Sequence, residues 1–329
     1  MAPLTPPDGI LVPSPTFYKA HADSPSSHHP EVDIAAQAAH TVHLARSGIA
    51  GVVLLGSTGE AIHLTRQERF DLIAGVRKGA EDAGFKDYPI MAGVLCNSTH
   101  ESLEWLDDAK KAGAQWGLVL APGYFGQAGS QDGLREWYTI VADNSPLPIL
   151  IYNYPGVTNN VTVSPDTYAA LAQHSNIVGC KMSHGNVSHH LQVSLHPKID
   201  PATFRVYSGF GQQLGPIVLF GAAGAIDALG AIYPKTVSHL HKLLTSNGPS
   251  AAPDAKTLDE VRKLQWLVST VEEFIVKNGI LGIREAVQRE LGFGNLEGGR
   301  LPLRGKMADG EWEKWDGVLR QIREKEASL

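Results

Sequence analysis

The sequence predicts an α/β fold, a (β/α)8 barrel of the TIM type with a helical appendage at its C-terminal end. Short apolar runs that suit strands buried on both faces alternate with segments of helical periodicity. Eight such runs precede residue 232, which is the number of strands that closes this barrel. Beyond residue 233 the pattern is purely helical. We therefore expect a barrel with the active site over residues 1–232 and a helical region over residues 233–329, with an open doubly wound sheet as the alternative.

The first half of the chain repeats one design, in which an apolar strand is followed by a loop and a helix. Thr65 with Glu68 three positions later forms a capping box, and Ser98 with Glu101 repeats the pattern, so each pair marks a helix start. Gly48 ends the helix before the second strand. We expect strands over residues 10–13, 52–55, 89–95 and 116–121, and helices over residues 32–47, 65–76, 98–113 and 132–143.

The second half continues the alternation. Ser164 and Pro165 place a capping residue and a proline at the start of a helix, which is where a helix accepts both. We expect strands over residues 147–152, 177–181, 204–208 and 222–227, and helices over residues 166–174, 187–195 and up to residue 220. An Ala/Pro/Ser-rich break at residues 247–254 divides the helical region that follows.

The composition excludes several classes of function. Hydrophobic residues make up 43% and charged residues 19% of the 329 residues, and no apolar run is long enough to span a bilayer. The net charge of −6, from 28 basic and 34 acidic residues, comes without a basic run. We expect no nucleic-acid and no membrane partner, and we expect small molecules and other copies of the chain as partners.

Cysteine usage and the first residues bear on the compartment. Only Cys96 and Cys180 are present, far apart in the chain, so a disulfide framework is not expected and a reducing compartment is favoured. The Pro-rich start, residues 1–9, lacks the patterns of a secretory signal and of an Arg-rich presequence. A cytoplasmic location is the expectation, and a mitochondrial one stays open.

Three of the expected strands end in groups that can do chemistry. One strand ends in Lys181, a second ends in Tyr152, and a third leads into the hydroxyls of Ser57 and Thr58. Parallel α/β folds place their chemistry at the carboxyl ends of the strands. These side chains are therefore expected to converge on one site.

Lys181 is the most informative of these groups, because it stands alone at the end of an apolar strand. Burial disfavours the charged form of an amine, so its pKa is expected to fall. A shift from about 10.4 to about 7 costs roughly 4–5 kcal/mol, which a fold tolerates mainly where a neutral amine has chemistry to do. A lone lysine that snorkels to the surface or pairs with a carboxylate is the alternative. The presence of Tyr152 and Ser57 at the ends of other strands favours a reactive amine.

Two further patterns do not support a cofactor or a metal. The glycines at 209 and 211 are followed by Gly215, one position too late for the dinucleotide fingerprint. Four histidines between residues 184 and 196 could suggest a metal cluster, but His189 and His190 are sequence neighbours and would point about 100° apart on a helix. They are interpreted as surface histidines. No metal and no cofactor are expected.

Three motifs carry a resemblance to a known family. They are GSTGE at residues 56–60, YNYP at residues 152–155 and GCK at residues 179–181. In this order and at these separations, the chain resembles the dihydrodipicolinate synthase / N-acetylneuraminate lyase family of pyruvate-handling class I aldolases. The resemblance extends over nearly the whole chain and includes the C-terminal helices.

The resemblance implies a role for each matching residue. Lys181 would form a covalent imine with the substrate, and Tyr152 would transfer protons. Ser57 would link Tyr152 to Tyr124 in a hydroxyl relay. In this family the residue that matches Tyr124 reaches across a dimer interface, so a homodimer or homotetramer is expected. Thr58 and the amides of its loop would hold the substrate carboxylate.

Ser183 and Gly209 are added to Ser57 and Thr58 as expected substrate contacts. One departure bears on the reaction: dihydrodipicolinate synthases carry a carboxylate-binding arginine where this chain has Val157. Residues 171–179, LAQHSNIVG, are similar to 4-hydroxy-2-oxoglutarate aldolases and to fungal 2-keto-3-deoxy-sugar-acid aldolases.

The resemblance therefore predicts a reversible Schiff-base aldolase that cleaves a 2-oxo-3-deoxy or 4-hydroxy-2-oxo acid to pyruvate and an aldehyde. Val157 fits a neutral, hydroxylated aldehyde half better than glyoxylate. A dihydrodipicolinate synthase-type condensation and a sugar-acid dehydratase on the same scaffold are the alternatives. A non-catalytic barrel that binds keto acids is a remoter one.

Overall fold

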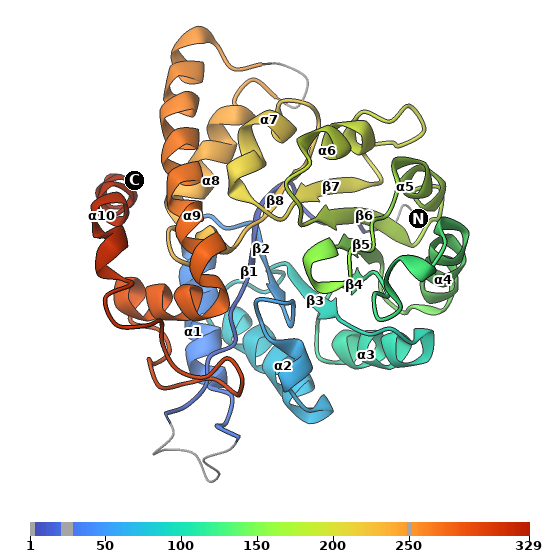
Figure 1. Ribbon diagram of the computed structural model, residues 1–329, viewed down its shortest axis with the longest axis horizontal. Helices are drawn as coiled ribbons and strands as arrows, with labels where there is room; N and C mark the ends of the chain where they lie inside the picture. Colours follow the sequence, from blue (N-terminus) through green and yellow to red (C-terminus); the bar gives the residue numbers. More distant parts are fainter. Residues whose placement is uncertain (1–3, 21–28, 249–251) are drawn as a thin grey trace.

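Eight parallel strands close into a barrel in the computed structural model, which describes residues 4–20, 29–248 and 252–329. The strands follow one another in chain order, and β1 completes the ring by pairing with β8 (Figure 1). The predicted barrel is confirmed, and the open sheet is excluded. The strands are β1 (Gly9–Pro13), β2 (Gly51–Leu54), β3 (Ile90–Val94), β4 (Trp116–Leu120), β5 (Ile149–Asn153), β6 (Ile177–Met182), β7 (Arg205–Ser208) and β8 (Gly224–Ile226).

Helices cover the outside of the barrel, and short 3-10 turns follow several strands. The helices are α1 (Ile34–Arg46), α2 (Arg66–Asp82), α3 (Thr99–Lys111), α4 (Gln131–Asn144), α5 (Pro165–Leu171), α6 (Val187–Ser194), α7 (Leu214–Val218) and α8 (Pro234–Leu244). The turns are η2 (Ala61–His63), η3 (Gly126–Ala128), η4 (Pro155–Val157), η5 (Gly211–Gln213), η6 (Ala228–Ala231) and η7 (Glu313–Trp315).

Helix starts agree closely with the capping signals. Thr65 caps α2 in a complete capping box with Glu68, and Ser98 accepts a hydrogen bond from the backbone of Glu101 at the start of α3. Ser164 caps α5 in the same way. The expected helix over residues 166–174 is wrong at its end, because α5 stops at Leu171. A tight turn leads from there into β6, and the side-chain amide of Asn176 donates to three backbone carbonyl oxygens.

Strand alternation divides the apolar side chains between two cores. Cys180 points outward into the large core between the strands and the helices. A smaller core fills the barrel and includes Leu11, Val53, Met91, Leu118, Leu150, Tyr152 and Tyr207. Because β5 and β6 pair with Tyr152 beside Lys181, these two side chains stand next to each other at the carboxyl end of the barrel.

The C-terminal helices pack against the barrel rather than standing apart. α8 contacts β1 and α7, and the long helix α9 (Ala255–Leu291) contacts α8 and the turns η5 and η6 (Figure 1). α10 (Asp316–Ala327) then packs on α8 and α9. The expected break lies between α8 and α9, although residues 249–251 are outside the described part. The division at residues 232 and 233 stays a prediction.

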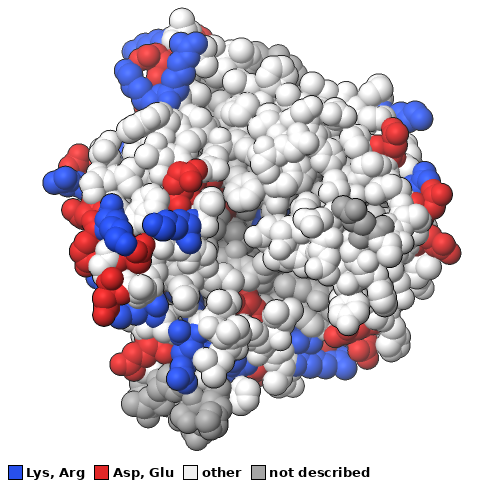
Figure 2. All heavy atoms as spheres, viewed as in Figure 1, with Lys and Arg blue, Asp and Glu red and all other residues white. Residues whose placement is uncertain are grey.

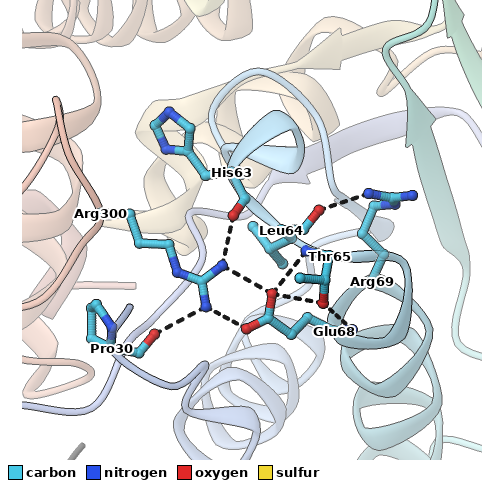
Figure 3. A network of polar contacts seen from close by, with 7 residues as sticks. All are labelled: Pro30, His63, Leu64, Thr65, Glu68, Arg69 and Arg300. Atoms are coloured by element: carbon cyan, nitrogen blue, oxygen red, sulfur yellow. Dashed lines mark hydrogen bonds and ion pairs between the residues drawn. The ribbon is translucent and has the colours of Figure 1, made fainter. Parts of the chain in front are cut away.

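Arg300 joins the C-terminal segment to the barrel. Its guanidinium donates to the carbonyl oxygen of His63 at 2.6 Å and to that of Pro30 at 3.1 Å, and it forms an ion pair with Glu68 (Figure 3). The side chain of Glu68 also accepts from the backbone of Thr65 at 2.8 Å, so the cap of α2 and the C-terminal segment share one carboxylate. The contacts with His63 and Pro30 bring together parts of the chain that are far apart in sequence.

The face of the molecule in Figure 2 carries its charged side chains mostly toward the margins, and both signs are interspersed there. The middle of this face is largely uncharged and is hollowed near its centre. Among the helices in the described residues, none has the length and apolar character needed to cross a membrane.

Candidate active site

Lys181 lies at the centre of the candidate site. Its side chain is 5% exposed and lines a cavity of about 320 Å³ at the carboxyl ends of the strands. The cavity brings together six of the seven residues predicted from the sequence: Ser57, Thr58, Tyr152, Lys181, Ser183 and Gly209. The convergence expected from three strand ends is therefore present, whereas the roles of these residues stay predictions.

The surroundings of Lys181 favour its neutral form. Burial lowers the pKa of the amine to about 7, and the only opposing influence is the negative charge of Asp227, which raises this pKa. The amine also lies 4.7 Å from the centroid of the Tyr152 ring. At neutral pH a large share of Lys181 is therefore an unprotonated amine, the form that attacks a carbonyl carbon.

Tyr152 presents its phenol to the same cavity from β5. The phenol oxygen lies 3.4 Å from the hydroxyl oxygen of Ser57, and the Ser183 side chain lies nearby and lowers the pKa of the phenol. A distance of 3.4 Å is long for a hydrogen bond between hydroxyls, and such contacts often tighten only when substrate binds. Burial raises the pKa of the Tyr152 phenol, so the group is neutral near pH 7.

The loop that carries Ser57 and Thr58 has an unusual backbone. Leu55, directly after β2, has φ of 62°, and Glu60 at the other end of the loop has φ of 51°. A buried, branched residue in this left-handed region costs about 1–2 kcal/mol. Gly93 on the neighbouring strand makes the conformation possible, because a Cβ there would stand 2.2 Å from the carbonyl oxygen of Leu55.

Ser183 and Gly209 lie on neighbouring strand ends and touch. The backbone N–H of Gly209 donates to the carbonyl oxygen of Met182 at 2.8 Å, and a Cβ at position 209 would stand 2.1 Å from the Ser183 hydroxyl oxygen. A glycine at this position therefore leaves room for the Ser183 side chain at the rim of the cavity.

Tyr124 does not reach the Lys181 cavity within one chain. It lines a neighbouring cavity of about 410 Å³, which shares Ser57, Val157 and Ile280 with the first. Its side chain is 75% exposed and packs edge-on against Phe125, which is 80% exposed. The Asn97 side chain holds the Tyr124 backbone by accepting its N–H at 2.9 Å.

Of the four histidines between residues 184 and 196, His189 and His190 are buried, so their interpretation as surface side chains is wrong, whereas His184 and His196 are partly exposed. His190 is fully buried and its two ring nitrogens contact the carbonyl oxygens of Asn186 and Met182. His189 is 6% exposed and stacks on His184 at 4.9 Å between ring centroids. The His190 ring faces the carbonyl of Met182 on β6, whereas the His189 ring packs against His184 and against Tyr168 of α5. Within the described residues no group of His, Cys, Asp or Glu is arranged to hold a metal ion.

Two acidic residues of the cavity wall were missed in the sequence. Asp227 follows β8 and Glu272 lies on α9, and both line the Lys181 cavity. The position of Asp227 at the end of an expected strand was a usable signal. Glu272 lies 45 positions further along the chain inside a long helix, and nothing in its local sequence marks it.

A closed barrel with a neutral lysine, a tyrosine and hydroxyls at its strand ends defines an enzyme of the (β/α)8 class. The model of the dihydrodipicolinate synthetase family matches residues 21–303. The chain belongs to this family, and the family expected from the sequence is confirmed.

Individual relatives cover most of the chain. It is 31% identical over 309 residues to an L-threo-3-deoxy-hexylosonate aldolase of Hypocrea jecorina, and this match covers 92% of each chain. It is 32% identical over 292 residues to a protein of Emericella nidulans provisionally named a mitochondrial 4-hydroxy-2-oxoglutarate aldolase, covering 89% of this chain and 87% of the relative.

Solved structures of the same family superpose on the whole fold. The crystal structure of a dihydrodipicolinate synthase family protein from Coccidioides immitis is 30% identical, with a TM-score of 0.82 and full coverage of both chains. The chloride-inhibited dihydrodipicolinate synthase from Acinetobacter baumannii, complexed with pyruvate, is 26% identical with a TM-score of 0.81, covering 97% of this chain and 99% of that one.

The contact between Gly209 and Ser183 leads to a first prediction. Gly209→Ala places a methyl group against Ser183 and forces the two strand ends apart, so kcat/KM should fall by about 10²-fold, the effect of a displacement near 1 Å. Gly185→Ala on the same rim is the matched control, because nothing lies within 4 Å of its Cβ. Steady-state kinetics of the two variants, with circular dichroism to check folding, make the comparison. Equal losses in both would contradict a specific role for the contact.

Proposed function

We propose that the protein is a class I aldolase that cleaves a 2-oxo-3-deoxy or 4-hydroxy-2-oxo acid to pyruvate and an aldehyde, reversibly, through an imine on Lys181. The observation that carries this proposal is a buried amine with a pKa of about 7, placed beside a buried phenol in one cavity. Relatives named as aldolases support the class of reaction. The pyruvate in a related crystal structure supports a small 2-oxo acid as the bound substrate.

The proposed reaction begins with the attack of the neutral Lys181 amine on the 2-oxo carbon. Loss of one water and uptake of one proton give a protonated imine. The C3–C4 bond then breaks, and its electron pair moves onto C3 to form an enamine with the imine nitrogen as the electron sink. The C4 hydroxyl loses its proton and C4 leaves as the aldehyde. Protonation of C3 and hydrolysis of the imine release pyruvate and restore the amine.

Tyr152 is proposed to move the proton of the C4 hydroxyl. Because its phenol is neutral near pH 7, it can accept this proton only as it passes its own proton on. Ser57 and Ser183 supply the hydroxyls that lie beside it. A relay of hydroxyls adds no charged group to the cavity, so it does not change the pKa of the Lys181 amine in the free enzyme.

Thr58 and the amides of the 56–60 loop are proposed to hold the carboxylate of the substrate. These donors carry no net charge that would compete with imine formation. The described residues that line the cavity include no arginine, and Val157 lies at its rim. This composition favours aldol cleavage over the dihydrodipicolinate synthase-type condensation, whose aldehyde carries a carboxylate.

Two other functions remain as alternatives on the same scaffold. A sugar-acid dehydratase would use the same imine but release no pyruvate, so product analysis over a panel of 2-oxo-3-deoxy acids separates it from an aldolase. A non-catalytic keto-acid-binding barrel would not need a neutral lysine, a buried phenol and two serines in one cavity. The aldolase is therefore the better supported function.

Assembly and location belong to the same proposal. We infer a homodimer or homotetramer, because an exposed pair of aromatic side chains, Tyr124 and Phe125, stands beside the site without cover from the described residues of its own chain. A cytoplasmic location stays a prediction, and mitochondria are the compartment in the names of two relatives. The proposed reaction needs no resident metal or cofactor.

The imine leads to a second prediction. Borohydride added with pyruvate should inactivate the enzyme and add one pyruvate-derived mass to Lys181, seen by peptide mass spectrometry, whereas Lys181→Ala should gain no mass. The rate of inactivation should fall as the pH drops below about 7, because protonation removes the attacking amine. A chelator should leave activity intact. Loss of activity in the chelator, with no adduct on the wild type, would point instead to metal chemistry.

The phenol of Tyr152 leads to a third prediction. Tyr152→Phe should lower kcat by about 10²–10⁴-fold with the fold retained, the usual range for a group that transfers protons in the transition state. Steady-state kinetics and circular dichroism test it. A change confined to KM would mean that Tyr152 only positions the substrate.

The exposure of Tyr124 leads to a fourth prediction. If Tyr124 completes the hydroxyl relay of a partner subunit, then Tyr124→Phe and Lys181→Ala should each be inactive alone but recover turnover when their subunits are mixed. One site of each mixed dimer then has both groups intact. Activity is measured after subunit exchange has been verified by native mass spectrometry. A fully active monomer, or no recovery after exchange, rules out a shared site.

A further inference from the structure

Two buried carboxyl groups stand together in the wall of the Lys181 cavity and take no part in the reaction described above. Asp227 is 1% exposed at the end of β8, and Glu272 is 2% exposed on α9. Both line the cavity that contains Lys181, and the two carboxyl groups are close enough for a hydrogen bond between them. A hydrogen bond between two carboxyl groups requires that one of them carries a proton.

The backbone around the pair holds each carboxyl in place. Glu272 Oε2 accepts the N–H of Gln212 at 2.8 Å, and Asp227 Oδ1 accepts the N–H of Leu229 at 3.2 Å. Asp227 Oδ2 is fully buried and has no N–H or hydroxyl donor among the described residues. Gly211 leaves space for it, since a Cβ there would stand 2.7 Å from this oxygen. A proton on Glu272 supplies the donor that Oδ2 otherwise lacks.

Electrostatics assigns the proton to Glu272. Burial and the charge of Asp227 both raise the pKa of Glu272 well above its ordinary value. Two buried carboxylates in contact strongly repel each other, so Glu272 holds a proton and the two groups together carry one negative charge. That charge acts on Lys181, because the negative charge of Asp227 raises the pKa of the amine.

The other titratable groups that face Lys181 are neutral near pH 7. They are the phenols of Tyr152 and Tyr154, and burial raises the pKa of both. Tyr152 belongs to β5 and Tyr154 to the turn after it, whereas Asp227 and Glu272 approach from β8 and α9. The carboxyl pair is therefore the only source of negative charge that the described cavity residues offer to the amine.

We propose that Asp227 and Glu272 share one proton and that their single negative charge is the counter-ion for the cationic nitrogen formed on Lys181. This inference rests on the proposed imine mechanism. When the amine condenses with the 2-oxo carbon, one water is lost and one proton is taken up, so the nitrogen becomes positive inside a buried site. Asp227 acts through Lys181 and is a positioning residue. Its charge also opposes a substrate whose aldehyde half is a carboxylate.

The test compares Asp227→Asn with Glu272→Gln. The amide that Glu272→Gln introduces can donate to Asp227 as a protonated carboxyl does, so this variant keeps the single charge, whereas Asp227→Asn removes it. The probe is dinitrofluorobenzene, a small amine reagent, and the labelling of Lys181 is followed against pH by peptide mass spectrometry without any turnover. Asp227→Asn should lower the pKa of Lys181 by about one unit, and Glu272→Gln should leave it in place.

Kinetics and spectroscopy complete the test. In Asp227→Asn the acidic limb of the kcat/KM profile should move to lower pH, and kcat should fall by about 10-fold or more because the protonated imine has lost its counter-ion. Glu273→Gln, on the same helix but exposed, is the matched control and should change neither value. Infrared spectra should show the carbonyl stretch of a protonated carboxylic acid in the wild type and not in Glu272→Gln.

Three results overturn the proposal. One is an unshifted Lys181 pKa in folded Asp227→Asn, and a second is an equal fall of the Lys181 pKa in Glu272→Gln. The third is a wild-type infrared spectrum without the protonated carboxyl, which decides the question even if Asp227→Asn does not fold. Failure of the proposed function is distinguishable, because it appears as a wild type that forms no borohydride-trapped pyruvate adduct, while the labelling comparison needs no substrate.

Discussion

The desolvation of one amine is the constraint on which the rest of the site depends. Holding Lys181 with a pKa of about 7 places the ammonium form at a disadvantage of roughly 4–5 kcal/mol relative to water. The barrel provides this environment because the interior core below Lys181 is apolar and the strands on both sides are fully paired. The groups that surround the amine are phenols, hydroxyls and the carboxyl pair, so the pair supplies the single negative charge that faces the amine.

The C-terminal region is part of this environment and forms one wall of the site. α9 supplies Glu272 and several apolar side chains to the cavity wall, and Gly279 interrupts its helical backbone beside the cavity, with φ of 55° and ψ of −144°. Arg284, after the interruption, lies 3.2 Å from Glu60 at the end of the loop that carries Ser57 and Thr58. The ion pair of Arg300 with Glu68 anchors the next segment. The loop, the cavity wall and the chain end are thus held as one unit.

Much of the fold could be predicted because its signals are local. Apolar runs and capping boxes mark strands and helices within a few residues, and the count of eight parallel strands leaves the closed barrel as the natural arrangement. The errors lie where tertiary contacts decide. Helix α5 ends early where Asn176 binds carbonyls of the preceding unit. On α6, His190 is buried against a carbonyl of β6, and His189 is buried against His184 and α5.

The sequence by itself determined the strand-end chemistry of this protein. Lys181, Tyr152, Ser57 and Thr58 each follow an apolar run, and in a parallel barrel a position at a strand end is already a position in the site. Only the tertiary structure decided what surrounds them. Glu272 meets Asp227 across 45 residues, and Tyr124 lines a neighbouring cavity instead of the Lys181 cavity, because both depend on how α9 and the loop after β4 pack. Such contacts join segments whose local sequence patterns do not indicate that they pack together.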